Sequence, residues 1–234
     1  MRAGMIRRGV PSGIRAAAPR RKKSIDTDER LTLVLVEGIY DVEFLCRIST
    51  VLRHVDSAIP DLRMLEETGR LIFVPFGGGD PGFWAARFAP LGLSEIHIYD
   101  RETVADSVLR FSAAAIVNRR SNARAFVMSK RSIESYLHPD AIEAAFRVRV
   151  TCSDDGSIVD EIADAVLNRT CPHLDRSQLS RRGRRRLKLQ IKRKLNHDVV
   201  SNMTPALLDE SDPRGEVRSW LNAIAEAVAC DFSC

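Results

Sequence analysis

The sequence has no long apolar run, few cysteines and no histidine cluster. None of its apolar stretches approaches the roughly 20 residues that a membrane-spanning helix needs, so no membrane partner is expected. The histidines do not lie at metal-ligand spacing, which argues against a zinc site. An odd number of cysteines, with no CxxC pair and no secretory apolar segment, indicates reduced thiols in the cytoplasm; they are Cys46, Cys152, Cys171, Cys230 and Cys234.

Acidic residues are missing from two stretches that are rich in arginine and lysine. Residues 1–25 contain eight Arg or Lys, and the basic block, Arg176 to His197, contains ten. Because the net charge of the whole chain is only +5, the remainder is acidic. An acidic body with two basic stretches suits a protein that binds a polyanion and coordinates a cation beside it.

The first basic stretch has no sustained apolar periodicity. We predict that residues 1–28 form a disordered basic tail. An organellar transit peptide has a similar Arg-rich, acid-poor composition and is the alternative. A non-specific phosphate-binding arm is a further reading, although tails of this kind are usually only solvated.

Beyond the tail, short apolar stretches alternate with amphipathic ones. Leu31 to Val36 consists mainly of Leu and Val, and such a run is typical of a strand buried on both faces. Further strands are predicted at residues 71–76, 95–99 and 125–128, with helices starting at Asp41, at 83–88 and at 104–117. The alternation predicts an α/β fold with a mostly parallel four-stranded sheet flanked by helices.

From Pro139 onward the pattern contains helices only. They are predicted at residues 141–146, 158–167, 184–195 and 217–228. The last of them carries a core-facing apolar stripe that includes Trp220. We therefore predict a sheet domain over residues 29–138 and a C-terminal helical extension over residues 139–234.

Carboxylates follow two of the predicted strands. Glu37 ends the first strand and Asp41 lies four residues on, while Asp100 and Glu102 follow the third strand. The carboxyl ends of parallel strands meet at one edge of a sheet, where open α/β sheets bind ligands. Four carboxylates there would repel one another unless a cation joined them, and oxygen ligands suit Mg²⁺ or Mn²⁺. The plain alternative is that Glu37 only ends a strand and Asp41 only caps a helix.

Four elements in this order resemble a TOPRIM domain, which topoisomerases, bacterial primases and OLD-family nucleases share. They are the V-E-G-x-x-D string of Val36 to Asp41, the glycine-rich loop Gly77–Gly79, the D-x-[D/E] pair and the string Arg131 to Leu137. The last, RSIESYL, is similar to the R-x-I-E-x-Y-L element of the OLD branch. The resemblance covers roughly residues 31–138 and implies a TOPRIM-type, Rossmann-like sheet like that of the C-terminal nuclease part of OLD proteins.

The resemblance implies a Mg²⁺- or Mn²⁺-dependent endonuclease that hydrolyses phosphodiesters with two ions. It gives Glu37 the role of general acid/base or metal ligand, and it implies that Asp100 is catalytic. The metal ligands that it implies are Glu37, Asp41, Asp100, Glu102 and Glu134. It also implies a late lysine that offsets charge in the transition state, with Lys192 and Lys194 as the candidates.

The chain departs from the OLD pattern at two points. Glu102 replaces the second Asp of the usual D-x-D, and its longer side chain changes the spacing of the ligands. Full-length OLD proteins also resemble ATPases in their N-terminal half, but this chain has no GxxxxGK[ST] motif. Any ATPase would then be a separate partner.

The basic block predicts contacts with nucleic acid, DNA rather than RNA. The residues expected to make them are Arg184, Arg185, Arg186, Lys188 and Lys192. A solvated basic helix face is the usual alternative for such a charge run. A homodimer is a further expectation that the residues leave open.

Two other functions compete with a nuclease. A non-nucleolytic TOPRIM module would prime, join or only sense nucleic acid. A dinucleotide-binding protein is suggested by the GxGxxG pattern of residues 77–82, with Asp100 placed 18 residues beyond Gly82. Against the latter, Asp80 would face a pyrophosphate, the following helix is short, and Glu37, Asp41 and Glu134 stay unexplained. Glu134 also has a plain reading, as an exposed helix residue.

Overall fold

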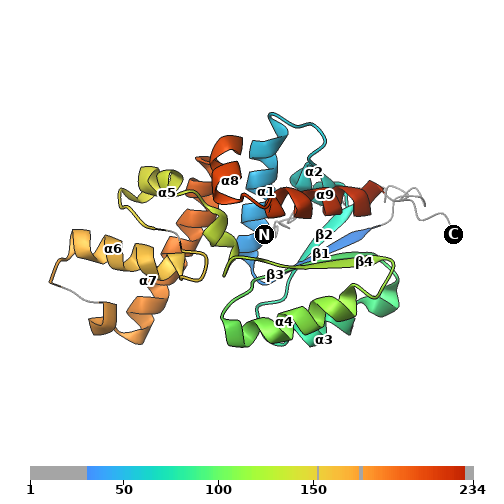
Figure 1. Ribbon diagram of the computed structural model, residues 1–234, viewed down its shortest axis with the longest axis horizontal. Helices are drawn as coiled ribbons and strands as arrows, with labels where there is room; N and C mark the ends of the chain where they lie inside the picture. Colours follow the sequence, from blue (N-terminus) through green and yellow to red (C-terminus); the bar gives the residue numbers. More distant parts are fainter. Residues whose placement is uncertain (1–30, 152, 174–175, 230–234) are drawn as a thin grey trace, which may run out of the picture.

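Four parallel strands form a single sheet in the order β2–β1–β3–β4 (Figure 1). The computed structural model describes residues 31–151, 153–173 and 176–229, so the predicted basic tail and three of the cysteines, Cys152, Cys230 and Cys234, lie outside the described residues. The strands are β1 (Thr32–Val36), β2 (Leu71–Pro75), β3 (Ser94–Tyr99) and β4 (Ala123–Val127). Helices flank this sheet, and the predicted α/β fold class is confirmed.

The central strands are buried on both faces, as their apolar composition predicts. Val34 and Val36 pack in one hydrophobic cluster, whereas Leu33 and Leu35 belong to a second cluster on the opposite face. The helices that flank the sheet are α1 (Ile39–Arg53), α2 (Leu62–Glu67), α3 (Pro81–Arg87) and α4 (Val104–Val117). Figure 1 shows α3 and α4 on one face and α1, α2 and α9 (Glu216–Ala229) on the other.

Two short helices lie where the sequence predicts only connections. One is α2, inside the polar segment 56–70, with the Asp61 carboxylate accepting a hydrogen bond from the Met64 amide at its start. The other is α8 (Pro205–Ser211), with Thr204 capping its start. Six or seven residues make too few turns for an apolar periodicity, so capping and packing define these helices.

Helix α1 begins two residues earlier than predicted. Gly38 is its N-cap, and Asp41 lies in the first turn, where its Oδ2 accepts a hydrogen bond from the Gly38 amide at 2.7 Å. This contact is one half of a capping box, the half made by the residue at the third helical position, because Gly38 has no side chain to make the other. Asp41 therefore does stabilise the helix start, and its side chain is buried.

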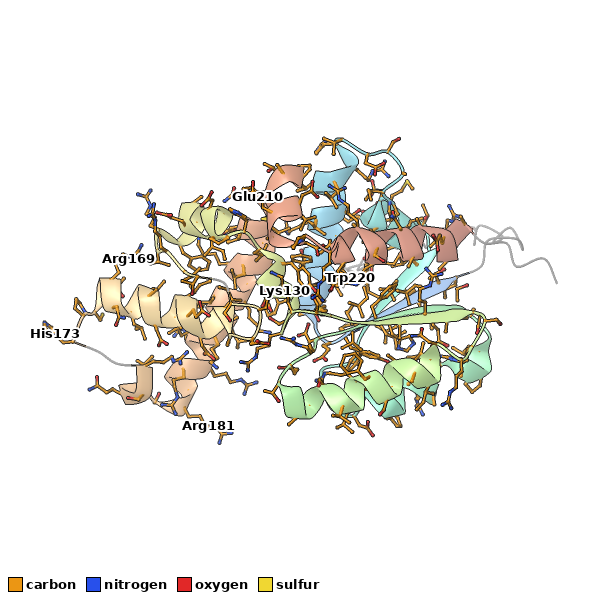
Figure 2. The ribbon with its side chains drawn as sticks, viewed as in Figure 1. Lys130, Arg169, His173, Arg181, Glu210 and Trp220 are labelled. Atoms are coloured by element: carbon orange, nitrogen blue, oxygen red, sulfur yellow. The ribbon has the colours of Figure 1, made fainter. Side chains whose placement is uncertain are left out.

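The chain after residue 138 is helical, as predicted, and part of it packs on the sheet. The remaining elements are η2 (Ile133–Tyr136), α5 (Pro139–Phe146), α6 (Ile158–Thr170), η3 (Arg176–Gln178), α7 (Arg181–Lys194) and the π-helical turn η4 (Leu195–Val199), with a short turn η1 (Ala89–Leu91) earlier. The ring of Trp220 on α9, which Figure 2 labels, packs against that of Tyr136, with centroids 5.1 Å apart. One hydrophobic cluster thus joins the sheet to helices of the extension. The division at residue 138 stays a prediction.

Two further findings bear on the expectations from composition. Cys46 is a buried free thiol of α1 and Cys171 is an exposed one. Among the described residues, no helix is both long enough and apolar enough to cross a bilayer.

Candidate metal and nucleic-acid site

Three of the predicted carboxylates meet at the carboxyl edge of the sheet. Glu37 follows β1 and Asp100 follows β3, and these strands are neighbours whose register pairs Leu35 with His97. Carboxylate oxygens of Glu37, Asp100 and Glu102 all lie within 4.8 Å of one another. This separation allows one divalent cation to contact all three, so the residues fit the ion that the sequence predicts.

Glu102 reaches this cluster through an unusual backbone conformation. Its φ of 58° lies in the left-handed region, and its amide donates a hydrogen bond to the carbonyl of Arg131 at 2.9 Å. A non-glycine residue held there costs about 1 kcal/mol or more, and such strain is concentrated at functional sites. Asp100 and Glu102 contribute to the same cluster, although the chain turns after Tyr99 instead of continuing as a strand.

A second group of carboxylates, which also includes Asp100, is buried and interacts electrostatically. Asp41, Asp100 and Glu134 are 6%, 6% and 1% exposed. Burial, followed by the charge of Glu134, raises the pKa of Asp41 to about 7. Burial and then the charges of Asp41 and Glu134 raise the pKa of Asp100 well above its usual range. Glu134 is therefore a buried neighbour of the other acids, and the reading of it as an exposed helix residue is wrong.

Of the two candidate lysines, the structure brings only Lys192 to the carboxylates. The Lys192 Nζ lies 3.4 Å from Oε1 of Glu134, whose charge is the main reason that the pKa of Lys192 is raised. Lys194 instead pairs with Asp198 at 3.1 Å and lies over the ring of Phe146. The position of Lys192 suits an ammonium that offsets negative charge beside the acids.

Two further residues of the site were not predicted from the sequence. Arg110 of α4 is buried, and its Nε donates to Oε1 of Glu37 at 3.1 Å. Burial raises the pKa of Glu37, and Arg110 opposes this rise. Asn196 of η4 is also fully buried, with its amide nitrogen 3.2 Å from Glu134 Oε1. An arginine on the apolar side of a predicted helix was a usable signal for Arg110, whereas an asparagine at a helix end looks like an ordinary cap.

The basic block divides into residues with protein partners and residues that face solvent. Arg184 donates to the backbone carbonyls of Ser177 and Leu179, and Lys188 pairs with Asp160 at 2.7 Å. Arg185 and Arg186 are exposed on α7. They line an open groove of about 580 Å³ together with Tyr40, Arg182, Leu189, Gln190 and Arg193.

This basic groove adjoins the acids through α1. Tyr40 precedes Asp41 in the first turn of that helix, so one turn of α1 contributes to both the groove and the carboxylate group. Figure 2 shows Arg181, at the start of α7, pointing away from the sheet at the far end of the helix. A separate pocket of about 860 Å³, whose lining includes Lys130 and Glu210, contains none of the five predicted metal ligands.

The glycine-rich loop does not have the form of a dinucleotide site. Gly77, Gly78 and Gly79 all have positive φ, and the helix that follows, α3, has only seven residues. The carboxylate of Asp80 accepts a hydrogen bond from the Gly82 amide at 2.8 Å. A carboxylate thus occupies the helix start, where a dinucleotide fold places the pyrophosphate.

Fold and site together define a parallel α/β domain with a carboxylate cluster at the carboxyl ends of its strands. Two solved structures of the C-terminal region of the OLD protein of Xanthomonas campestris pv. campestris are similar to this chain at 16% identity. The one phased with iodine covers 85% of this chain and 95% of its own, with a TM-score of 0.49; the one phased with platinum covers 86% and 94%, with a TM-score of 0.46. No family model and no curated protein matches the sequence.

Proposed function

We propose that this protein is a Mg²⁺- or Mn²⁺-dependent endonuclease that hydrolyses phosphodiester bonds in nucleic acid, DNA rather than RNA. The observation that carries the proposal is the cluster of three carboxylate oxygens, from Glu37, Asp100 and Glu102, within 4.8 Å of one another. The donors are all oxygens, without histidine or cysteine, which suits Mg²⁺ or Mn²⁺ and not zinc.

The raised pKa values support the need for a cation. Burial and mutual repulsion raise the pKa values of Asp41 and Asp100, so without a cation these two carboxyl groups retain protons near neutral pH. A bound divalent cation would neutralise these charges, polarise a phosphate and promote attack by water. Asp41 and Asp100 would then both be ionised in the working protein.

The roles that we propose for side chains follow from their contacts. Lys192, beside Glu134, would offset negative charge that develops on the phosphate. Glu37 would transfer the proton of the attacking water or of the leaving oxygen, with Arg110 holding its carboxylate in place. Asp41, Asp100, Glu102 and Glu134 would serve as metal ligands, and Glu37 would also contact the ion held by its cluster with Asp100 and Glu102.

The basic groove supports nucleic acid as the substrate. Arg182, Arg185, Arg186 and Arg193 provide positive charge for phosphates, and Tyr40 provides an aromatic ring on which a base can stack. Arg184 and Lys188 make contacts within the protein, so their part in binding is secondary to that of the groove. The proposal extends to action in the cytoplasm, to a homodimer and to a separate ATPase partner.

A cleavage assay tests the proposal. Purified protein is incubated with supercoiled plasmid and with labelled single strands of DNA and RNA, in Mg²⁺ or Mn²⁺ and in chelator. We expect cleavage of DNA that needs the metal and that disappears in Asp100→Asn, a variant that preserves the shape of the side chain. Protein that is folded but inert on every substrate with both metals would favour the non-nucleolytic TOPRIM module.

A further inference from the structure

Asn196 lies at an irregular turn of backbone beside the acids. It belongs to η4, the π-helical turn that continues from α7, and its side chain is completely buried. Single π-helical turns within helices are rare and frequently occur at functional sites. The wider turn changes which side of the helix its residues occupy, and here it places an amide against Glu134.

The orientation of this amide follows from its neighbours. The Asn196 nitrogen Nδ2 donates to Glu134 Oε1 at 3.2 Å and to the backbone carbonyl of Lys192 at 3.0 Å. Both neighbours are acceptors, so the NH₂ group must face them, and Oδ1 is the atom of this amide that is left for another partner. The assignment of oxygen and nitrogen is thus fixed by chemistry.

The contact leaves two buried oxygens without partners. Oδ1 of Asn196 and Oε2 of Glu134 accept no hydrogen bond from any of the described residues, although both atoms are shielded from solvent. Buried polar atoms are nearly always paired, because an unpaired acceptor has lost its water without compensation. The two residues touch each other, and Glu134 acts electrostatically on both Asp41 and Asp100. A partner of either oxygen would therefore lie beside a group of acceptors.

Lys192 does not supply this partner. Its ammonium group lies against Oε1 of Glu134, the same oxygen that the Asn196 amide contacts. The free oxygen is Oε2, so a ligand there would leave the lysine contact in place. A neutral amide oxygen and a carboxylate oxygen are ordinary ligands of hard divalent cations.

We propose that Asn196 Oδ1 and Glu134 Oε2 bind a divalent cation of the Mg²⁺ or Mn²⁺ type, at a position distinct from the Glu37–Asp100–Glu102 cluster. The inference rests on the proposed function for the presence of the metal, but it adds Asn196 as a ligand. Asp41 and Asp100 lie close enough to contribute charge to this second position.

Calorimetric titration with Mn²⁺ tests the inference without relying on activity. We expect two Mn²⁺ per chain in the wild type. Asn196→Leu and Glu102→Gln should each lose one ion, and the double variant should lose both. Two outcomes would show that Asn196 is not a ligand while leaving the proposed function intact. In the first, the wild type and Asn196→Leu both bind two ions. In the second, the wild type binds a single ion, which only Glu102→Gln removes. A wild type that binds no Mn²⁺ overturns both.

A second variant covers the case in which Asn196→Leu does not fold. Asn196→Asp keeps the shape but replaces the amide donors with a second oxygen. As a ligand it should bind Mn²⁺ about tenfold more tightly than the wild type, because added ligand charge strengthens such sites. Lys192→Met is the matched control, since it makes the region more negative by the same amount without adding a ligand. Affinity in Asn196→Asp no higher than in Lys192→Met overturns the inference.

Discussion

Lys192 and Lys194 lie two residues apart on α7, and the helix turns them toward different partners. Lys192 contacts the buried Glu134, whereas Lys194 pairs with the half-exposed Asp198. The electrostatic attraction between a lysine and an acid is strongest where water is excluded, because the solvent screens the charges less there. At the scale of single residues, burial of the partner therefore distinguishes two lysines that the sequence presents as equals.

We expect Lys192→Met to lower the rate of single-turnover cleavage by about 10²- to 10³-fold, the loss typical of one electrostatic contact to the transition state. Mn²⁺ affinity should hold or rise, because a cation that competes for Glu134 is removed. Lys194→Met is the control and should retain the wild-type rate. Equal losses in both variants would mean that α7 has been disturbed as a whole.

Asp41 makes the stability of the metal-free protein depend on pH. Its pKa is raised from 3.8 to about 7, so the folded protein holds a proton that the unfolded chain releases. The stabilising contribution is complete below the unfolded value and is lost as the pH rises through about 7.

In chelator, the Tm of Asp41→Asn minus that of the wild type should increase from pH 5 to pH 8, because Asn cannot ionise. The increase should correspond to about 1 kcal/mol or more. Adding Mn²⁺ at pH 8 should reverse the order, since the metal stabilises the ionised carboxylate. A Tm difference that stays constant over this pH range would show that Asp41 does not titrate in it.

At the scale of elements, α7 has two functional sides. One side holds Ile191, which is buried, and Lys188, which pairs with Asp160 of α6. The exposed side carries Arg185 and Arg186 into the groove with Tyr40. A run of positive charge in the sequence is therefore divided by the helix period into charges that hold the fold and charges that are free for a ligand.

Replacing both Arg185 and Arg186 by Gln should weaken DNA binding and flatten the plot of log K against log salt. The slope should fall by about one unit for each phosphate that the protein no longer neutralises. Fluorescence anisotropy in chelator measures binding without cleavage. Lys188→Gln, on the other side of α7, should leave the slope unchanged; a slope that falls only in Lys188→Gln would place the substrate on the opposite face.

Strand β3 shows a different use of polar residues within an element. Its alternating residues Glu95, His97 and Tyr99 are completely buried, although such alternation usually indicates a solvent-facing side. His97 bonds to Glu95 through Nε2 and to the Tyr99 hydroxyl through Nδ1, both at 2.8 Å, and Arg120 pairs with Glu95 at 2.7 Å. The network provides partners for the side chains of Glu95, His97 and Tyr99, and it supports the strand that precedes Asp100.

At the scale of the whole molecule, the last described helix, α9, completes the hydrophobic core on one face of the sheet. Trp220 of α9 is 1% exposed and belongs to the same hydrophobic cluster as Val34 and Ile96. The Oγ1 of Thr32 in β1 donates to the carbonyl of Ala227, 195 residues away, at 3.3 Å. The sheet face that α9 covers would be exposed to water without it.

A chain limited to residues 29–138 should therefore lack a cooperative thermal transition, whereas residues 29–229 should unfold cooperatively. Trp220→Ala in the full chain should reduce stability by about 3–5 kcal/mol, the usual result of deleting a buried aromatic side chain. Arg218→Ala, which removes only a partly exposed ion pair with Asp209, should cost less than about 1 kcal/mol. Cooperative folding of residues 29–138 alone would establish the predicted domain division.

The sequence alone determined the parallel sheet and the place of the acids. Leu- and Val-rich runs are local signals, and Glu37 and Asp100 are marked by their positions after such runs, so both follow from periodicity and chain order. Only the tertiary structure decided which lysine faces the acids, that Glu134 is buried, and that Asn196 leaves an oxygen free. These facts depend on how α7 and η4 pack against η2, some 60 residues earlier in the chain. Local periodicity specifies an element and its apolar side, but long-range packing selects the partner of each polar side chain.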